Sequence, residues 1–247
     1  MFEKYYESPA YGEWCRRVYG KDLKQLGCVT MDELEILYRE VKLSPDSYIL
    51  DLGCGPGYIS AEIAGHYDSR LTGIDFDEGS IAHAKITFSD YPRLNFIHGD
   101  GCTVSFKAST FDLICFCDSL HFTQTDEKLY ALLDKCLYML KPGGKIVIFR
   151  GQDNRQVFLW GRNSNTSLKT VDLIETNKRL WSGVLIELKN MYIELRREVP
   201  ETYERLIRES VDKIKSDGWS PRWLYIFSKY EGMPQNDMVV PLADVFR

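Results

Sequence analysis

The strongest structural signal in this chain is the run Ile49-Leu-Asp-Leu-Gly-Cys-Gly-Pro-Gly57 (ILDLGCGPG). Its first half is a short apolar run, which predicts a buried strand. Its second half places glycine at positions 53, 55 and 57, where the backbone can turn tightly and approach a ligand because no Cβ intervenes. A helix is predicted next, over Tyr58 to Tyr67, and its first turn offers free N–H groups. This order indicates a ligand site at the end of the strand.

The same alternation of strands and helices continues along the chain. Further strands are predicted at 71–75, 94–100, 110–117, 145–149 and 223–228, and further helices at 31–41, 79–88 and 126–140. Strands that alternate with helices predict an α/β fold of the Rossmann-like, doubly wound type, with a mostly parallel sheet and helices on both faces. In such sheets a ligand binds outside the carboxyl ends of the strands.

The chain is expected to divide into three parts. Residues 1–151 form the core with an N-terminal helical flap, 152–217 form a polar, helical insertion after the fifth strand, and 218–247 hold a final strand and an irregular tail. The insertion is interpreted as a lid over the end of the sheet, where it would keep water out of a site. The alternative is a layer that only packs.

The start of the first long helix has its own signature. Thr30-Met-Asp-Glu33 predicts a capping box, in which the Thr30 side chain caps the helix and the Glu33 side chain reaches back to the Thr30 backbone.

Composition favours a small-molecule partner. The net charge is −5, whereas a nucleic-acid binder usually carries a basic face. Seven scattered cysteines form no CxxC pair, so no metal site is predicted and a reducing, cytoplasmic location is expected. The N-terminus lacks the apolar core of a signal peptide, and no stretch reaches the length of a membrane span. We therefore expect neither a nucleic-acid nor a membrane partner, and the sequence does not give the oligomeric state.

The acids near the glycines narrow the class of ligand. Asp75 ends the second predicted strand, where an acid can hydrogen-bond both hydroxyls of a ribose. The dinucleotide fingerprint is GxGxxG, but this chain has GxGxG with Asp51 two residues before Gly53. That difference favours a ligand without a pyrophosphate over NAD.

Five ordered stretches carry a family resemblance. They are ILDLGCGPG (49–57), LTGIDFDEGSIAHAK (71–85), FIHGDG (96–101), FDLICFCDSLHF (111–122) and LKPGGKIVIF (140–149). In this order and spacing the chain resembles the class I S-adenosylmethionine-dependent methyltransferase superfamily. The resemblance implies S-adenosylmethionine as cofactor and S-adenosylhomocysteine as product.

The resemblance also implies cofactor contacts at the strand ends. Those expected on the methionine part are Asp51, Gly53, Cys54, Gly55 and, through its backbone, Cys117. Those expected on the nucleoside are Asp75 at the ribose, Phe76 on the adenine ring, and Asp100, Gly101 and Cys102 at the adenine edge. A structural role for Asp51, capping backbone N–H groups, is the alternative for that residue.

The segment from Tyr19 to Gly27 resembles the N-terminal flap of small-molecule members such as phosphoethanolamine methyltransferases. That resemblance implies that Gln25 touches the cofactor carboxylate and that Tyr19 covers the methyl group. A packing role for Tyr19 is the alternative.

The candidate catalytic residues follow the fourth predicted strand. Methyl transfer is an in-line displacement, so positioning can supply most of the catalysis. Asp118 is expected to orient an amine or pair with a cation, and His121 can accept a proton near neutral pH or simply bond to the backbone at a helix start. The Asn/Asp-Pro-Pro-Tyr motif of methyltransferases that act on nucleobases or glutamine is missing here.

The sequence thus predicts a methyltransferase that acts on a small molecule. A non-catalytic S-adenosylmethionine-binding regulatory protein and an NAD-dependent oxidoreductase are the alternatives. Three tryptophans lie in or beside the insertion, and core packing is a better interpretation for them than a cation-binding wall: Trp160, Trp181 and Trp223.

Overall fold

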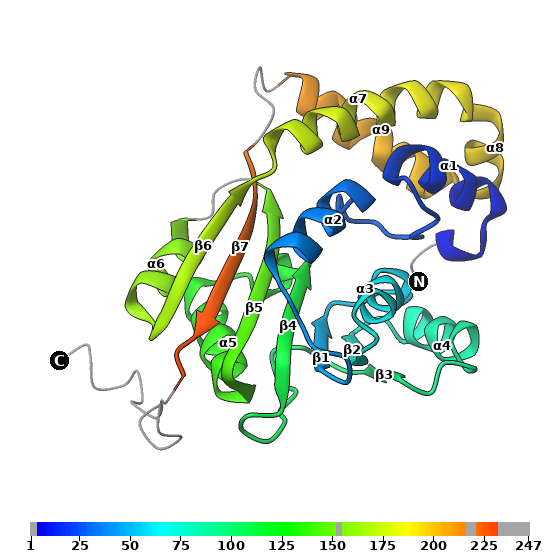
Figure 1. The fold of residues 1–247 in the computed structure, drawn as a ribbon. Helices are drawn as coiled ribbons and strands as arrows, with labels where there is room; N and C mark the ends of the chain where they lie inside the picture. The colour runs from blue at the N-terminus through cyan, green and yellow to red at the C-terminus, as the bar shows by residue number, and fades with distance from the viewer. Residues whose placement is uncertain (1–3, 152–154, 216–220, 232–247) are drawn as a thin grey trace.

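The computed structural model of the protein describes residues 4–151, 155–215 and 221–231, and its centre is one seven-stranded sheet (Figure 1). The strands are β1 (Tyr48–Leu52), β2 (Arg70–Asp75), β3 (Leu94–His98), β4 (Phe111–Cys117), β5 (Leu140–Gly151), β6 (Thr166–Asp172) and β7 (Arg222–Lys229). Their order is β3-β2-β1-β4-β5-β7-β6. The first five are parallel, and β7 runs antiparallel to β5 and β6. The predicted Rossmann-like α/β fold is confirmed.

Helices cover both faces of this sheet. They include α2 (Met31–Glu40), α3 (Tyr58–Tyr67), α4 (Glu78–Thr87), α5 (Asp126–Met139) and α6 (Arg155–Asn163). Because successive side chains of a strand point to opposite faces, Ile49 and Cys115 pack with α2 and α3, whereas Leu50 and Ile114 pack with α5 and α6. Both faces of the central strands are therefore buried, as their nearly continuous apolar runs require.

The order of strands reverses next to β1. The strand β1 pairs with β2 on one side and with β4 on the other, so the connections after β1 and β4 leave in opposite directions. Such a switch point leaves a crevice at the carboxyl ends of the strands. The glycines that follow β1 lie at this crevice.

A second group of helices lies beyond the carboxyl ends of β4 and β5 (Figure 1). It consists of α1 (Pro9–Tyr19), α7 (Ile174–Asn190), α8 (Tyr192–Glu198) and α9 (Pro200–Lys215), and the short 3-10 helix η1 (Tyr5–Glu7) precedes it. We call these five elements the roof. Its N-terminal and C-terminal parts are joined at Glu198, whose Oε2 accepts hydrogen bonds from Ser8 Oγ at 2.7 Å and Ala10 N at 3.0 Å.

Two expectations about the second half of the chain were wrong. The strand β6 lies inside the segment 152–217, which the sequence predicts to be helical. Its sequence TSLKTVD is mostly exposed and shows little apolar alternation, so only its pairing with β7 defines it. The fifth strand, predicted at 145–149, is longer than expected: β5 begins at Leu140, and its register with β4 shifts near its beginning. The predicted tail at 232–247 lies outside the described residues.

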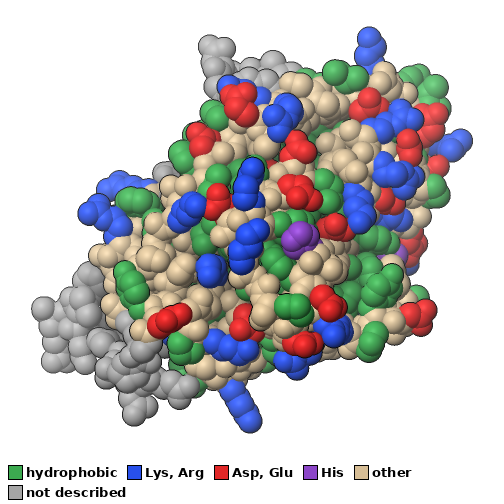
Figure 2. All heavy atoms as spheres, viewed as in Figure 1, with side chains coloured by type: hydrophobic (Ala, Val, Ile, Leu, Met, Phe, Trp, Pro, Cys, Tyr) green, Lys and Arg blue, Asp and Glu red, His purple; other side chains and the backbone are tan. Residues whose placement is uncertain are grey.

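The surface is mixed in charge on the face that Figure 2 shows, where Lys and Arg side chains alternate with Asp and Glu. No single basic patch covers this face. Across the described ranges, no helix combines the length and the apolar character that crossing a bilayer needs.

Candidate cofactor and acceptor site

One large cavity occupies the crevice at the carboxyl ends of β1, β2 and β4. Its volume is about 1420 Å³. Roof residues close it from the other side: Tyr5, Tyr6, Asn177, Trp181, Arg205, Glu209 and Asp212. A site for one ligand is typically about 300–1,000 Å³, so this cavity has room for two ligands side by side.

The glycine-rich turn after β1 forms part of the cavity wall. Gly53, Gly55 and Gly57 all have positive φ, at +84°, +52° and +85°. A Cβ on Gly53 would lie 2.3 Å from the Cβ of Ser119, which follows β4. A Cβ on Gly55 would meet nothing within 4 Å. The first glycine therefore permits close contact between two loops, and Gly55 borders open cavity.

This contact gives a first prediction. Replacing Gly53 with alanine is expected to destabilise the protein by about 3 kcal/mol, because it adds both a clash and a left-handed backbone cost. The free energy of unfolding in urea measures this. The control is Gly65→Ala in α3, where a Cβ meets nothing within 4 Å and stability should be unchanged or slightly higher. Equal effects in the two variants would contradict the close contact.

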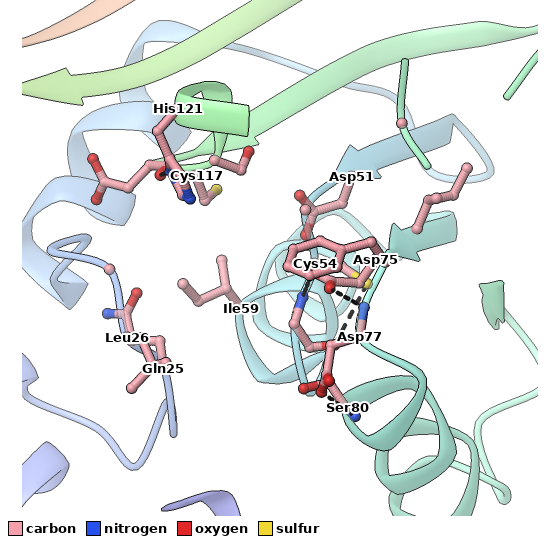
Figure 3. Close-up of a pocket in the computed structure, with 18 of the residues that line it drawn as sticks. Gln25, Leu26, Asp51, Cys54, Ile59, Asp75, Asp77, Ser80, Cys117 and His121 are labelled. Carbon is pink, nitrogen blue, oxygen red and sulfur yellow. Dashed lines mark hydrogen bonds between the residues drawn. The ribbon is translucent and has the colours of Figure 1, made fainter. Parts of the chain in front are cut away.

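Asp75 is fixed at the rim of the cavity. Its Oδ2 accepts a hydrogen bond from Gly55 N at 2.8 Å, and its Oδ1 accepts one from Asp77 N at 2.9 Å (Figure 3). Asp77 in turn caps α4 by accepting from Ser80 N. Each carboxylate oxygen of Asp75 can accept a further hydrogen bond, so the side chain presents two oriented acceptors.

Two buried oxygen atoms in the cavity have no donor among the described residues. One is Asp51 Oδ1; the other oxygen of Asp51 accepts from Ser60 Oγ. The second is Gln25 Oε1; the amide nitrogen of Gln25 donates to Val29 O, which fixes the orientation of the amide. Gln25 thus offers an acceptor, where a bound carboxylate would require a donor. Each of these oxygens can therefore accept a hydrogen bond from a donor group of a bound ligand.

The environment of Asp51 changes its acidity. Burial raises the pKa of Asp51 to about 6, the hydrogen bond from Ser60 opposes this shift, and the negative charge of Asp75 adds to it. Since the folded-state pKa is raised, the neutral carboxyl stabilises the unliganded fold at low pH. That contribution is lost as the pH rises through about 6.

The remaining predicted cofactor residues also line this cavity. They are Cys54, Phe76, Asp100, Gly101, Cys102 and Cys117. Phe76 is 60% exposed, and Asp100 accepts from Cys102 N at 2.8 Å. Figure 3 shows Gln25 and Leu26 across the cavity from Asp75 and Asp77. The strand-end residues named from the sequence are thus brought together.

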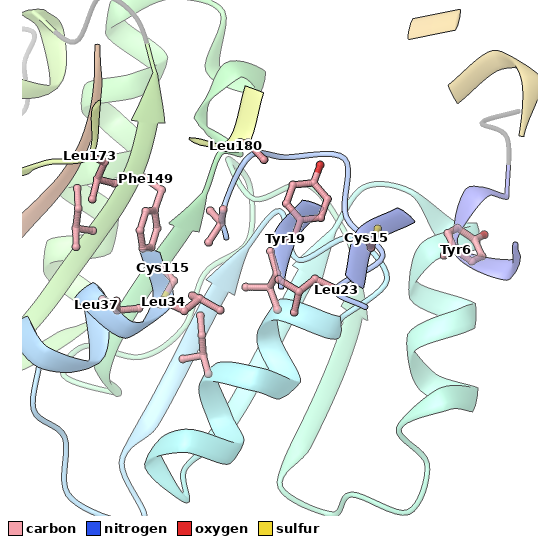
Figure 4. Packing of buried hydrophobic residues seen from close by; sticks show 14 of the residues in the cluster. Tyr6, Cys15, Tyr19, Leu23, Leu34, Leu37, Cys115, Phe149, Leu173 and Leu180 are labelled. Atoms are coloured by element: carbon pink, nitrogen blue, oxygen red, sulfur yellow. The ribbon is translucent and has the colours of Figure 1, made fainter. Parts of the chain in front are cut away.

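Tyr19 is the exception among the predicted site residues. It is not one of the cavity-lining residues, and its hydroxyl donates to Gly27 O at 3.0 Å. Its ring packs edge-on against Trp14, close to Leu23 (Figure 4). Tyr19 therefore packs in the core, which was the alternative to covering the methyl group of the cofactor. Aromatic residues that the sequence interpretation passed over, Tyr5 and Tyr6, line the cavity instead.

Asp118 is held by a cation of this same chain. Its Oδ1 and Oδ2 accept from Arg222 Nη1 at 2.7 Å and Nη2 at 2.9 Å, and Oδ2 also accepts from Cys28 N. Arg222 donates in addition to both carboxylate oxygens of Glu33 at 2.7 and 2.9 Å. Asp118 has a left-handed backbone, with φ at +59°. Asp118 is therefore already paired with a cation, Arg222, and both of its carboxylate oxygens accept hydrogen bonds within the protein. This geometry is compatible with a role in orienting an acceptor.

Half of the predicted capping box is confirmed and half is wrong. Thr30 Oγ1 accepts from Glu33 N at 3.2 Å, as a cap does. The Glu33 carboxylate instead accepts from Arg222 and from Thr176 at the start of α7. A partner 189 residues away leaves no local pattern in the sequence.

His121 lies in the 3-10 helix η2 (Leu120–Thr123) and lines the cavity. Its Nδ1 is 3.1 Å from Asp118 O. Because a carbonyl oxygen only accepts, Nδ1 carries the hydrogen when the ring is neutral, and Nε2 keeps a lone pair. The backbone bond expected for a helix-start residue is present, and it leaves Nε2 able to accept a proton.

These features together define an α/β domain with one large cavity at the carboxyl ends of its strands. Residues 49–144 match a family described as a methyltransferase domain. This part of the chain is thus a methyltransferase domain with the class I fold, a domain type whose cofactor is S-adenosylmethionine.

Similar proteins support this assignment. The chain is 27% identical over 153 residues to the U6 snRNA methylphosphate capping enzyme Amus of Drosophila melanogaster, covering 54% of this chain and 49% of the relative. It is 26% identical to the sterol 4-C-methyltransferase strm-1 of Caenorhabditis elegans, covering 68% and 52%. The chain therefore spans about half the length of these curated relatives.

A solved structure shares the fold. The Haemonchus contortus phosphoethanolamine N-methyltransferase 2, in complex with phosphomonomethylethanolamine and S-adenosylhomocysteine, superposes with a TM-score of 0.70 at 16% identity. The match covers 90% of this chain and 57% of that one.

The described residues fit the cofactor. The paired acceptors of Asp75 match the two hydroxyls of its ribose, and the donor-less oxygens of Asp51 and Gln25 are each able to accept from the amine of its methionine part.

Proposed function

We propose that this protein transfers a methyl group from S-adenosylmethionine to a small-molecule acceptor held under the roof. The observation that carries the proposal is the size of the cavity, together with its lining by both the strand ends and the roof. It extends from the cofactor-binding strand ends to α7 and α9, and it exceeds what one ligand needs. The acceptor would occupy the part bordered by His121, Trp181 and Arg205.

The named relatives give two acceptor types for comparison. One is named as a sterol methyltransferase and another as an RNA-capping enzyme. The mixed charge of the face in Figure 2 and the net charge of −5 favour a small molecule over RNA, whose phosphates call for basic residues. The methyltransferase whose structure is similar was solved with a small phosphorylated amine.

Each group at the site has a task in the proposed transfer. When bound, S-adenosylmethionine supplies an electrophilic methyl group on a sulfonium sulfur. Asp75 holds the ribose, and Asp51 with Gln25 accepts hydrogen bonds from the amine of the methionine part. The roof keeps water out, and the fixed positions of these side chains align the acceptor with the methyl group. His121 Nε2 takes the proton from an acceptor that arrives protonated.

The test is a transfer assay on the whole chain. Purified protein is incubated with methyl-labelled S-adenosylmethionine and a metabolite extract, and labelled products are separated from labelled RNA. We expect label in a small molecule. A protein that binds the cofactor and labels nothing would instead be the non-catalytic binding protein.

Proton removal by His121 gives a second prediction. His121→Gln is expected to slow methyl transfer about 100-fold when the acceptor carries a proton on its nucleophile. The affinity for S-adenosylhomocysteine should stay the same, because the variant leaves the strand-end acceptors intact. A kcat within twofold of the wild-type value would remove His121 from the proposed mechanism.

The raised pKa of Asp51 gives a third prediction. If the ionised carboxylate accepts from the cofactor amine, affinity for S-adenosylhomocysteine should rise about tenfold between pH 5 and pH 7, since Asp51 with a pKa of about 6 is about one-tenth ionised at pH 5. Calorimetric titrations across this range measure it. Asp51→Asn should flatten the profile, whereas His121→Gln should keep it. A profile that Asp51→Asn leaves unchanged would contradict this role.

A further inference from the structure

Arg205 carries an unmet hydrogen-bonding requirement. It lies on α9, on the face that also presents Glu209 and Asp212 to the cavity. Its Nε and Nη2 are covered by protein, yet they have no hydrogen-bond partner among the described residues. The nearby carboxylate of Glu209 places Oε1 3.8 Å from Nε, which is too far for a hydrogen bond. Buried donors without acceptors are costly, so their presence calls for an explanation.

Arg222 shows that the missing hydrogen-bond partners of Arg205 are unusual for this cavity. Arg222 lines the same cavity, and each of its three guanidinium nitrogens donates to Glu33, to Asp118 or to both. The chain can therefore satisfy an arginine at this cavity with its own residues. For Arg205, the residues that the structure describes supply only Glu209, at 3.8 Å.

The position of Arg205 links it to the transfer site. Burial raises the pKa of Tyr5, Tyr11 and Tyr19, and the positive charge of Arg205 opposes that effect in each. The hydroxyls of Tyr11 and Tyr19 donate to the carbonyls of Gln25 and Gly27. Arg205 and the segment from Gln25 to Cys28 line the same cavity.

The two unpaired donors also have a matched geometry. The N–H groups of Nε and Nη2 point to the same side of the planar guanidinium, so they can bind two oxygens of one carboxylate or phosphate. Such an anion is the partner for which this pair of donors is suited.

We propose that Arg205 binds an anionic group, a carboxylate or a phosphate, on the methyl acceptor. The proposal rests on the function proposed above, and it specifies the acceptor as an anion-bearing small molecule. Glu209 would then be a competitor, because its negative charge lies where the acceptor anion would bind. Its side chain is 43% exposed and can turn toward solvent when the acceptor binds.

The experiment uses the whole chain saturated with S-adenosylhomocysteine and titrated with inorganic phosphate and, separately, with acetate. Binding is followed by NMR shifts or calorimetry. We expect wild-type protein to bind at least one of these anions, and Arg205→Met to weaken that binding at least tenfold. Glu209→Gln should strengthen it, because the competing charge is gone. The matched control is Arg208→Met, which removes an exposed positive charge from the same helix and should leave binding unchanged.

Several results would overturn the proposal. They are no anion binding by the wild type, equal binding in Arg205→Met, and no gain in Glu209→Gln, which would mark the pair as structural. A loss of S-adenosylhomocysteine affinity in Arg205→Met would assign Arg205 to the cofactor carboxylate and also overturn it. If Arg205→Met does not fold, Arg205→Lys keeps the charge, loses the paired geometry and should still weaken anion binding. None of these readouts needs turnover, so failure of the proposed methyl transfer would be seen separately.

Discussion

Replacing Arg222 with methionine is expected to destabilise the folded protein by about 3–5 kcal/mol, because it leaves the buried carboxylate of Glu33 and the half-buried carboxylate of Asp118 without their cation. Arg222 is 2% exposed, and the Glu33 side chain is fully buried. The network joins the start of β7, the first turn of α2, the end of β4 and, through Thr176, the start of α7. Its loss should therefore loosen the roof as well as the sheet.

Urea unfolding with far-UV circular dichroism measures this effect. The control is Arg93→Met, which removes an exposed arginine that pairs with Asp46 and Asp68 at the surface and should cost under about 1 kcal/mol. Adding Glu33→Gln and Asp118→Asn to Arg222→Met should restore part of the stability, since the buried charges are then gone. A loss below about 1 kcal/mol for Arg222→Met would show that the network contributes little.

Replacing Asp75 with alanine is expected to weaken S-adenosylhomocysteine binding about 100-fold. Two charge-assisted hydrogen bonds to the ribose hydroxyls are lost, and together they account for about 3 kcal/mol. The variant also frees Gly55 N and Asp77 N, which the carboxylate now holds in place at the rim. Both effects lower the affinity for S-adenosylhomocysteine.

Calorimetric titration of Asp75→Ala measures the loss. Asp90→Ala is the matched control, because it removes an exposed carboxylate from the connection between α4 and β3 and should leave the affinity unchanged. Thermal unfolding of both variants shows whether Asp75→Ala is still folded. A loss of less than threefold in a folded Asp75→Ala protein would contradict a ribose-binding role.

The strands and the cofactor end of the site could be predicted because their determinants are local. The run from Ile49 to Gly57 encodes a buried strand, a turn with positive φ and a helix start within nine positions. Asp75 ends β2, so its place at the rim follows from the topology once the strand is recognised.

The acceptor end could not be predicted because its contacts are distant in sequence. Arg222 meets Glu33 and Asp118 across 189 and 104 residues, and no spacing rule connects them. Tyr5 and Arg205 reach the same cavity from η1 and α9, which are distant in sequence, and Glu198 of α8 joins these two parts of the roof. Tyr19 had the expected position in the flap, yet its hydroxyl found a backbone partner and its ring joined the core.

The most direct test of the central claim is calorimetric titration of the purified chain with S-adenosylhomocysteine, with NAD titrated in parallel. The cavity, the glycine turn and the oriented acceptors of Asp75, Asp51 and Gln25 predict saturable one-to-one binding of the sulfur ligand and no binding of NAD. Absence of binding by S-adenosylhomocysteine to folded protein, or tighter binding of NAD, would contradict the account.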